Sequence, residues 1–156
     1  MTLEQELQAE QVSHLDLSGF SQVASGTTIR ETIAKMREGR HNVCLVTADD
    51  KLVGIFTDRD VLRKVVANPE LLDTPIDSVM TQSPITIKPD ASAATALRMM
   101  DDNHFRNVPA VDADGNIVGS MTHLAIVNYL ATRYPVEVLN QPPRPDQFPS
   151  KAEGGD

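Results

Sequence analysis

Apolar and polar residues succeed one another along this chain in a pattern that predicts short strands and amphipathic helices. Ile29, Ile33 and Met36 recur at the spacing of one helix face, and Gly39 is suited to end that helix. Apolar runs bounded by turn residues predict strands after it. The predicted elements of this first series are a helix that begins at Thr27 or Thr28, strands over 42–47 and 52–56, and a helix that opens at Thr57 and is broken at Asn68-Pro69.

A second series of the same kind occupies the later part of the chain. Its first helix carries Ala96, Leu97 and Met100 on one face, and the polar turn 112–116 separates its two central strands. The predicted elements of this series are a short strand over 85–87, a helix that begins within 89–92, strands over 107–111 and 117–121, and a closing helix over 122–133.

The two series are copies of one unit. Val43 matches Val108 and Thr57 matches Thr122 at a constant separation of 65 positions. Met36 matches Met100 at a separation of 64, which indicates one inserted or deleted residue between the helix and the next strand. An internal repeat indicates the architecture before any other signal.

Each copy reads as a β-α-β-β-α unit of about 60 residues, a size at which a single core is marginal. We therefore expect an α/β (α+β) fold in which two repeats pack sheet to sheet with pseudo-twofold symmetry. The clefts between the repeats are then natural ligand sites. The expected domains are an N-terminal helical segment over 1–19, repeats over 20–75 and 76–133, and a tail over 134–156.

The two ends of the chain lie outside the repeats. Residues 3–16 predict a thin amphipathic helix built on Leu3 and Leu7, with a frayed terminus as the alternative. Half of the 10 prolines follow Tyr134, which predicts an extended, flexible tail.

Composition narrows the function classes. With 22 acidic and 14 basic residues the net charge is −8, which argues against a nucleic-acid-binding surface. No apolar run approaches the roughly 20 residues of a membrane span, so no membrane role is expected. The single Cys44 lies in an apolar strand and is expected to be a buried core thiol, which favours a cytoplasmic setting.

Metal-binding and catalytic patterns are not found in the sequence. The four histidines make no metal-ligand spacing with one another or with Cys44. The turn 112–116 begins like a calcium loop, but His123 stands where the closing glutamate belongs. No serine–histidine–aspartate order, phosphate-binding glycine loop or carboxylate pair stands out. We therefore expect neither a metal site nor an enzyme.

The segment 54–60, Gly-Ile-Phe-Thr-Asp-Arg-Asp, ends a strand and opens a helix. Thr57 at the N-cap and Asp60 three residues later can cap that helix, which stabilises it by about 1 kcal/mol. The same hydroxyl, carboxylate and free amides can instead bind a ligand, since a carboxylate accepts both hydroxyls of a ribose. These residues alone leave both interpretations open.

The duplicated unit resembles a tandem pair of cystathionine-β-synthase (CBS) domains, together called a Bateman module. The resemblance rests on the repeat, on 54–60 and on 105–112, Phe-Arg-Asn-Val-Pro-Ala-Val-Asp, and it covers about Phe20 to Arg133. It implies a regulatory sensor of adenosine-containing ligands such as AMP, ADP, ATP or S-adenosylmethionine, with no required cofactor. It also implies a homodimer and a regulated protein partner that the sequence does not identify.

The resemblance further implies a first site shared between the repeats. Asp60 would hold the ribose hydroxyls, Ile85 would face the adenine and Arg106 would face the phosphates. Arg59 and Lys88 either help to bind the ligand or belong to the solvated surface. The residues implied for this site are Ile55, Thr57, Asp60, Pro84, Ile85, Thr86 and Arg106.

A second site departs from the family pattern. Ala125 stands where the ribose-binding acid is expected, and His41 stands where an arginine is expected. We therefore expect this site to be empty, weak or specific for something other than an ordinary ribose. The residues implied for this weaker site are Ser21, Gln22, His41, Ser120 and Thr122.

Two functions are carried forward. The leading hypothesis is a regulatory adenosine-nucleotide-binding module, a stand-alone CBS pair that signals to a partner. The alternative is a constitutive dimerisation or protein-interaction module whose clefts bind no nucleotide. A thermal shift that is lost in Asp60→Ala distinguishes them.

Overall fold

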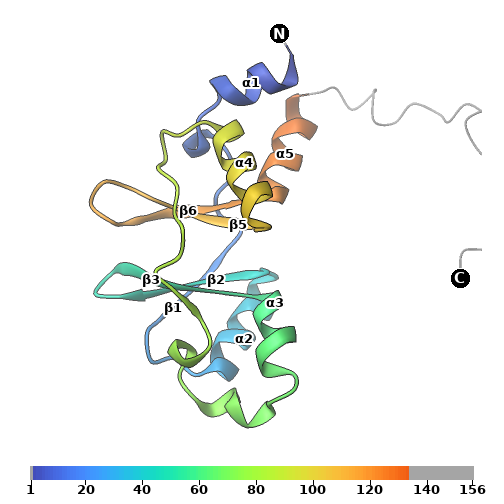
Figure 1. Cartoon of the computed structure of the whole chain (residues 1–156). Coiled ribbons are helices and arrows are strands. Elements are labelled where there is room, and N and C mark those ends of the chain that lie inside the picture. The colour runs from blue at the N-terminus through green and yellow to red at the C-terminus, as the bar shows by residue number, and fades with distance from the viewer. Residues whose placement is uncertain (1, 134–156) are drawn as a thin grey trace, which may run out of the picture.

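The computed structural model describes residues 2–133 and arranges them as two α+β repeats whose sheets face each other (Figure 1). The helices of each repeat lie on the outer side of its own sheet, so the layers run helices, sheet, sheet, helices. This confirms the expected α+β repeat pair. The predicted flexible tail, 134–156, lies outside the described residues.

Residues 2–133 contain fifteen helices, turns and strands. η2 is a π-helix, and the other η elements are 3-10 helices. The fifteen elements are α1 (Leu3–Ala9), η1 (Val12–His14), β1 (Ser21–Ala24), α2 (Ile29–Gly39), β2 (Val43–Ala48), β3 (Lys51–Thr57), α3 (Asp58–Asp60), η2 (Val61–Val65), η3 (Pro69–Asp73), η4 (Ile76–Ser78), β4 (Thr81–Gln82), α4 (Ala93–Asn103), β5 (Asn107–Val111), β6 (Ile117–Thr122) and α5 (His123–Arg133).

The sheet of repeat 1 has the strand order β1-β2-β3-β4. β1 runs parallel to β2, and the other two pairings are antiparallel. The β2–β3 hairpin turns through Asp49 and Asp50, whose φ angles of 51° and 62° suit the type I′ turns that match strand twist. This tight hairpin brings Thr57, at the end of β3, beside Val43 at the start of β2.

The sheet of repeat 2 consists of the antiparallel pair β5-β6. The prediction of a strand over 85–87 is wrong. Of these residues only Ile87 pairs with β5, through an isolated parallel bridge to Ala110. Ile87 N donates to the Pro109 carbonyl at 2.9 Å and Val111 N donates to the Ile87 carbonyl at 3.1 Å. The neighbouring parallel bonds would need amides from Pro89 and Pro109, which proline does not have.

Each sheet is extended at its edge by chain that leads into the other repeat. β4 lies within 76–133, the range expected for repeat 2, yet Gln82 pairs with Gly54 in repeat 1. Leu17 precedes repeat 1, yet its carbonyl accepts from Ser120 N at 2.9 Å in repeat 2. Sequence patterns did not predict β4, because its two residues are exposed and polar. The reciprocal exchange ties the repeats together.

Each repeat has its own hydrophobic core on the helix side of its sheet. The core of repeat 1 includes Cys44, Val46 and Phe56, and that of repeat 2 includes Met100, Val108 and Met121. Alternate strand residues point to opposite faces, so other buried residues on β2 and β5 face the inter-repeat layer. They are Val43, Leu45 and Pro109.

The N-terminal helix is shorter than predicted. α1 ends at Ala9, and η1 follows in place of a continuous helix to residue 16. Backbone bonds to repeat 2 take over at this point, since Val12 N donates to the Ala91 carbonyl and Ala93 N donates to the Glu10 carbonyl. Leu7 and Val12 then join the core of repeat 2.

The extra residue of repeat 2 lies in the β5–β6 hairpin, which corrects the predicted position after the helix. Val43 pairs with Thr57 in repeat 1, and Asn107 pairs with Thr122 in repeat 2. The separation of equivalent positions is therefore 64 as far as β5 and becomes 65 only at β6. The prediction failed because β2 and β5 are continuous apolar runs that match in two registers.

Candidate functional site

A cavity of about 490 Å³ opens between the repeats, within the size range of small-molecule sites. Repeat 1 contributes the end of β3 and the first turns of α3 and η2, and repeat 2 contributes the segment that leads from α4 into β5. Thr86 does not line the cavity. The other six residues predicted for the first site do: Ile55, Thr57, Asp60, Pro84, Ile85 and Arg106.

Thr57 and Asp60 form a reciprocal capping box at the start of α3. Asp60 N donates to Thr57 Oγ1 at 3.4 Å, and Thr57 N donates to Asp60 Oδ2 at 3.0 Å. The capping interpretation of these two residues therefore holds in the structure. It does not exclude a ligand, because both side chains also line the cavity.

The Asp60 carboxylate lies among several donors. Thr57 Oγ1 donates to Oδ2 at 3.3 Å, and Lys64 Nζ lies 3.4 Å from Oδ1. Lys64 in turn donates to the Val79 carbonyl at 2.7 Å, which holds its ammonium beside Asp60. The Asp60 side chain is 15% exposed, so the carboxylate is partly shielded and still reachable from the cavity.

Three arginines line the cavity, of which only Arg106 was assigned there with a specific role. Arg59 Nη1 donates to the carbonyl of His104 at 3.2 Å, which joins α3 of repeat 1 to the end of α4 in repeat 2. Arg63 lines the same cavity one helical turn after Arg59. Its spacing of four residues from Arg59, on a helix that opens at the cleft, was the sequence signal that would have found it.

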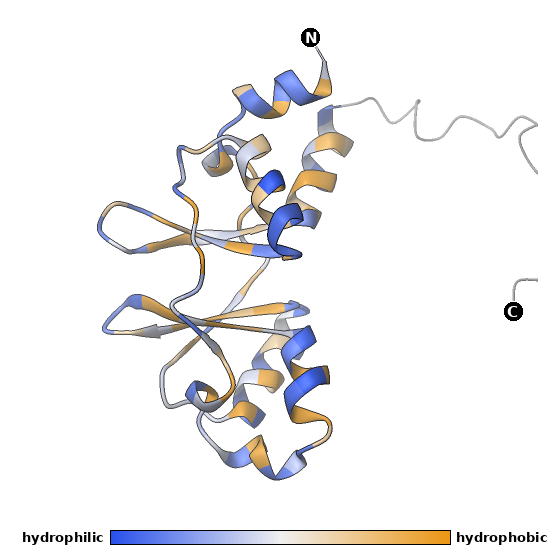
Figure 2. Ribbon diagram, viewed as in Figure 1, coloured by the Kyte–Doolittle hydropathy of each residue, from blue (hydrophilic) through white to orange (hydrophobic). Residues whose placement is uncertain are grey.

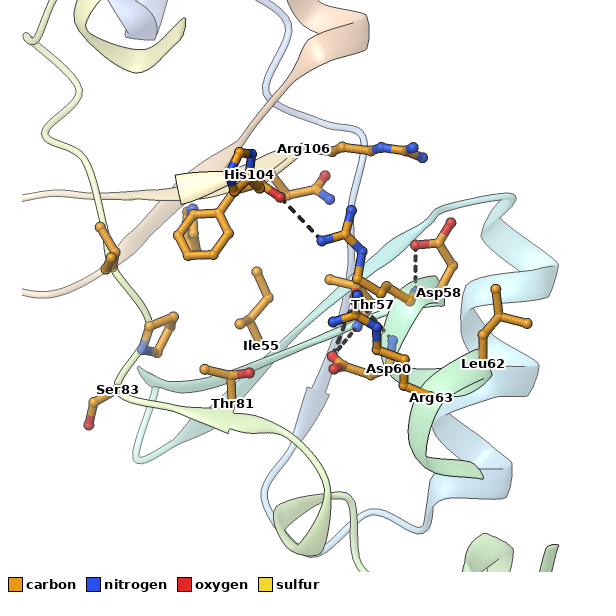
Figure 3. Close-up of a pocket in the computed structure, with 16 residues that line it drawn as sticks. Ile55, Thr57, Asp58, Asp60, Leu62, Arg63, Thr81, Ser83, His104 and Arg106 are labelled. Atoms are coloured by element: carbon orange, nitrogen blue, oxygen red, sulfur yellow. Dashed lines mark hydrogen bonds between the residues drawn. The ribbon is translucent and has the colours of Figure 1, made fainter. Parts of the chain in front are cut away.

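Figure 3 shows how these side chains divide the site. In this view the Asp60 carboxylate lies on the side of Ile55 and Thr81, whereas Arg106 extends toward the side of Asp58. The cavity residues that sequence analysis did not assign are Asp58, Leu62, Arg63, Thr81, Ser83, His104, Phe105, Asn107 and Pro109.

A smaller cavity of about 220 Å³ adjoins the first. The two share Arg59, His104, Phe105 and Arg106 as lining residues. The smaller cavity adds Met100 and Asp101 from α4 and His123 from the start of α5. His123 therefore lies beside the first site.

The second predicted site lacks both charged groups of the first. Thr122 Oγ1 accepts from Ala125 N at 3.0 Å, so this helix is capped without an acid. Asn42 is the structural counterpart of Arg106: Asp58 N donates to the Asn42 carbonyl at 3.0 Å, and His123 N donates to the Arg106 carbonyl at 3.2 Å. The expectation that His41 replaces the arginine is thus corrected by the hairpin insertion.

Of the other residues predicted for the second site, Ser21, Gln22 and His41 make contacts within repeat 1. Ser21 Oγ lies 3.0 Å from His41 Nδ1, a hydrogen bond inside repeat 1. Gln22 pairs with Leu45 in the β1–β2 ladder. Ser120 is fully buried, and its Oγ has no hydrogen-bond partner among residues 2–133.

Cys44 is buried in the core of repeat 1, and burial raises the pKa of its thiol to about 11. A thiol with this pKa is neutral at physiological pH and is a poor nucleophile. Within residues 2–133, no group of three or more His, Cys, Asp or Glu side chains is arranged to hold a metal ion. The same residues contain no helix with the length and apolarity that a bilayer crossing requires.

A family model described as the CBS domain matches the chain twice, over residues 20–67 and 76–132. Among curated proteins, the chain is 34% identical over 116 residues to arabinose 5-phosphate isomerase KdsD of Pseudomonas aeruginosa, which covers 74% of this chain and 35% of that protein. It is 34% identical over 110 residues to the CBS domain-containing protein CBSCBSPB1 of Arabidopsis thaliana, covering 67% and 20%. The chain thus spans a minor part of these relatives.

Solved structures share the fold. An uncharacterized conserved protein from Pyrococcus horikoshii has a TM-score of 0.73 and 25% identity, covering 82% of this chain and 97% of that one. CBSX2 in complex with AMP has a TM-score of 0.68 and 22% identity, covering 80% and 98%. The CBS domain pair of protein MJ0100, in complex with 5′-methylthioadenosine and S-adenosyl-L-methionine, has a TM-score of 0.70 and 23% identity, covering 80% and 98%.

Proposed function

The chain belongs to the CBS-domain family, and on that premise we propose that it is a regulatory module that binds an adenosine nucleotide between its two repeats. One observation carries the proposal: Asp60 of repeat 1 and Arg106 of repeat 2 line one cavity of about 490 Å³. An acid suits the hydroxyls of a ribose, and a guanidinium suits a phosphate. Neither group is present at the equivalent positions, Ala125 and Asn42.

Each lining residue has a role in this proposal. Ile55 and Ile85 supply apolar surface for the adenine, and Ile85 is 47% exposed and so free to be covered by a base. Asp60 accepts from the ribose hydroxyls, with Thr57 beside it. Pro84 shapes the wall next to Ile85. Thr86, which does not line the cavity, has no direct contact in this scheme.

Asp60 can accept a ligand without leaving its cap. A carboxylate has about four lone-pair sites, and the present contacts use Oδ2 for Thr57 and Oδ1 for Lys64. A ribose hydroxyl that donates to Oδ1 competes with the more distant Lys64 ammonium. We therefore expect Lys64 to move on binding while the capping box stays intact.

The candidate ligands are AMP, ADP, ATP and S-adenosylmethionine. CBSX2 and the MJ0100 domain pair carry ligands of this class in their crystals, and both have the fold of this chain. A ligand that contacts both repeats favours one arrangement of the repeats over another, and such coupling is typically worth about 1–3 kcal/mol. This coupling is how occupancy would reach a regulated protein partner.

A homodimer is part of the proposal. Leu62, Val66, Leu124 and Val127 are more than half exposed, and Figure 1 shows α3 and α5 on the same side of the molecule. Apolar positions follow both segments (Figure 2). Leu62 and Val127 are equivalent in the two repeats, so this face is itself pseudo-twofold. Such a face suits a second copy in a closed, symmetric interface.

The proposed role is regulatory rather than catalytic. Among residues 2–133, no histidine hydrogen bonds to a hydroxyl group of the cavity, so no activated nucleophile is assembled there. A cytoplasmic location, expected from the single cysteine, stays a prediction. The alternative function, a constitutive interaction module with empty clefts, predicts that no adenosine compound binds.

A thermal-shift panel on the whole chain tests the proposal. At about 100 times its dissociation constant, a bound ligand stabilises by about 2.7 kcal/mol, which raises Tm by several degrees. We expect such a shift with AMP, ADP, ATP or S-adenosylmethionine and its loss in Asp60→Ala. Ser92→Ala is the matched control, because Ser92 caps α4 through a 3.0 Å bond to Thr95 N and does not line the cavity. If none of the four compounds shifts Tm, the interaction-module function replaces this one.

A further inference from the structure

The two cavities lie side by side, because they share four lining residues, and charge is distributed unevenly between them. The larger cavity has the apolar wall of Ile55, Pro84 and Ile85 and the Asp60 carboxylate. Arg59, Arg106 and His104 line both cavities, and His123 lines only the smaller one. A ligand that enters the larger cavity base first therefore has its other end directed at the smaller one.

Guanidinium groups are concentrated along the two cavities. Arg59 and Arg106 line both cavities, and Arg63 lines the larger one. Two of the acids that line the cavities already have hydrogen-bond or ion-pair partners. Asp60 is in its capping box and beside Lys64, and Asp58 accepts from Arg59 N at 2.8 Å. Asp101 is the one acid that only the smaller cavity adds.

The other repeat carries none of these guanidinium groups at the equivalent positions. Leu124 stands in place of Arg59, Asn128 in place of Arg63 and Asn42 in place of Arg106. The net charge of the chain is −8, so a local cluster of three arginines is opposite in sign to the charge of the whole protein. Neither the helix caps nor the sheets require them, because the other repeat folds in the same way without them.

We propose that the smaller cavity is a subsite for the terminal phosphates of the ligand, so that the chain selects nucleoside di- or triphosphates. This inference rests on the proposed function of the larger cavity as an adenosine site. The proposal assigns the α-phosphate to the side of Arg63 and the terminal phosphates to the space between Arg59, Arg106 and His123. Arg59 then leaves the His104 carbonyl and donates to phosphate oxygens.

Charge decides among the candidate ligands. A terminal phosphate carries about −1.5 to −2 at pH 7, and each further phosphate adds about one more negative charge. AMP therefore leaves part of the guanidinium charge unmatched, whereas ADP and ATP extend toward all three arginines. S-adenosylmethionine carries a sulfonium, an ammonium and only one carboxylate group, so its net charge is positive and is repelled by the arginines. The expected order of affinity is ATP or ADP first, then AMP, then S-adenosylmethionine.

Isothermal titration calorimetry of the full chain in metal-free buffer measures this order. One additional charged hydrogen bond corresponds to about tenfold or more in affinity, so ATP or ADP is expected to bind at least about tenfold more tightly than AMP. AMP binding as tightly as ATP and ADP would overturn the subsite and leave the proposed function in place. Failure of all four adenosine compounds to bind would overturn the proposed function itself.

His123→Glu tests the smaller cavity directly. His123 is the first residue of α5, where an acid is favourable for helix stability, and it lines only the smaller cavity. The variant is expected to lower ATP affinity at least about tenfold and AMP affinity clearly less, so that the ATP-to-AMP ratio collapses. Thr95→Glu, at an exposed position of α4 that lines neither cavity, is the matched control and is expected to keep the wild-type ratio. A wild-type ratio in His123→Glu would sink the inference.

Discussion

Thr57 and Asp60 cap each other across the first turn of α3, and both side chains line the inter-repeat cavity. One pair of residues thus stabilises the helix and presents a carboxylate to the cavity. In repeat 2 the equivalent helix keeps the threonine cap, with Thr122 Oγ1 bound to Ala125 N, and lacks the acid. The cap needs the hydroxyl in both repeats, and the acid is present only where the cavity has its arginines.

Asp60→Asn separates the two roles of this residue. The Asn amide oxygen can still accept from Thr57 N, so we expect the free energy of unfolding to fall by only about 0.5 kcal/mol, less than the loss of a whole cap. The amide cannot accept both ribose hydroxyls as a carboxylate does, so adenosine-nucleotide affinity is expected to fall at least about tenfold. Urea denaturation and calorimetry on one preparation measure both. Wild-type affinity in Asp60→Asn would contradict a ligand role for the carboxylate.

Gly54 and Gly119 are equivalent positions where the exchanged edge strands come close. A Cβ at Gly119 would lie 2.6 Å from the Leu17 carbonyl oxygen, whereas a Cβ at Gly54 would lie 2.3 Å from Met80 Sδ. The Met80 side chain can rotate away, but the Leu17 backbone is held by its bond from Ser120 N. We expect Gly119→Ala to cost about 3 kcal/mol and Gly54→Ala about 1 kcal/mol, as for overpacked cores.

Urea denaturation of both glycine variants checks this order, with unchanged m-values as evidence that the folded and unfolded states are comparable. Equal destabilisation by the two substitutions would show that the edge strands are not held as described.

The proposed homodimer is tested by charging its face. Val66 and Val127 are 63% and 57% exposed and line neither cavity. Val66→Glu and Val127→Glu place like charges opposite one another in a symmetric interface, so we expect monomers in light scattering after size-exclusion chromatography. Val118→Glu is the control: Val118 is 42% exposed near the start of β6, and the β5–β6 hairpin projects on the side opposite α3 and α5 (Figure 1), so the variant is expected to dimerise. Dimers in all three variants would exclude this face.

Hydrogen bonds to the Asp77 carboxylate make the free energy of unfolding depend on pH in the acid range. The Ser25 hydroxyl and the Gly26 amide donate to its carboxylate and hold the pKa of Asp77 below its ordinary value. Because the folded-state pKa is the lower one, this contribution is present above pH about 4 and is lost as pH falls through the folded-state pKa.

Asp77→Asn is therefore expected to lower the free energy of unfolding by about 1 kcal/mol at pH 7, at the low end for a charged hydrogen bond because the site is exposed. The difference from wild type should shrink at pH 3 and below. Asp90→Asn, in an exposed turn, serves as the control. A difference that stays constant from pH 7 to pH 3 would argue against the linkage.

The helices and their caps could be predicted because the signals are local. Thr28, Ser92 and Thr57 each accept from a backbone amide three residues later, as side chains at an N-cap do. The six cavity residues that were predicted came from the repeat and from the family resemblance together. Arg63 was not predicted, although its spacing of four residues from Arg59 is visible in the sequence. No sequence pattern distinguishes an arginine that lines a cavity from one on the solvated surface.

Residue order by itself determined the duplicated unit, the apolar strands and the capped helices, because hydrophobic periodicity and N-cap chemistry act over a few neighbouring residues. Tertiary structure alone decided the edge exchange of Leu17 and β4, the hairpin position of the extra residue and the cavity beyond Arg59. Each of these depends on contacts between distant positions, such as the Arg59 bond to the His104 carbonyl. Such contacts form only when two sheets close on each other, and no local preference encodes that closure.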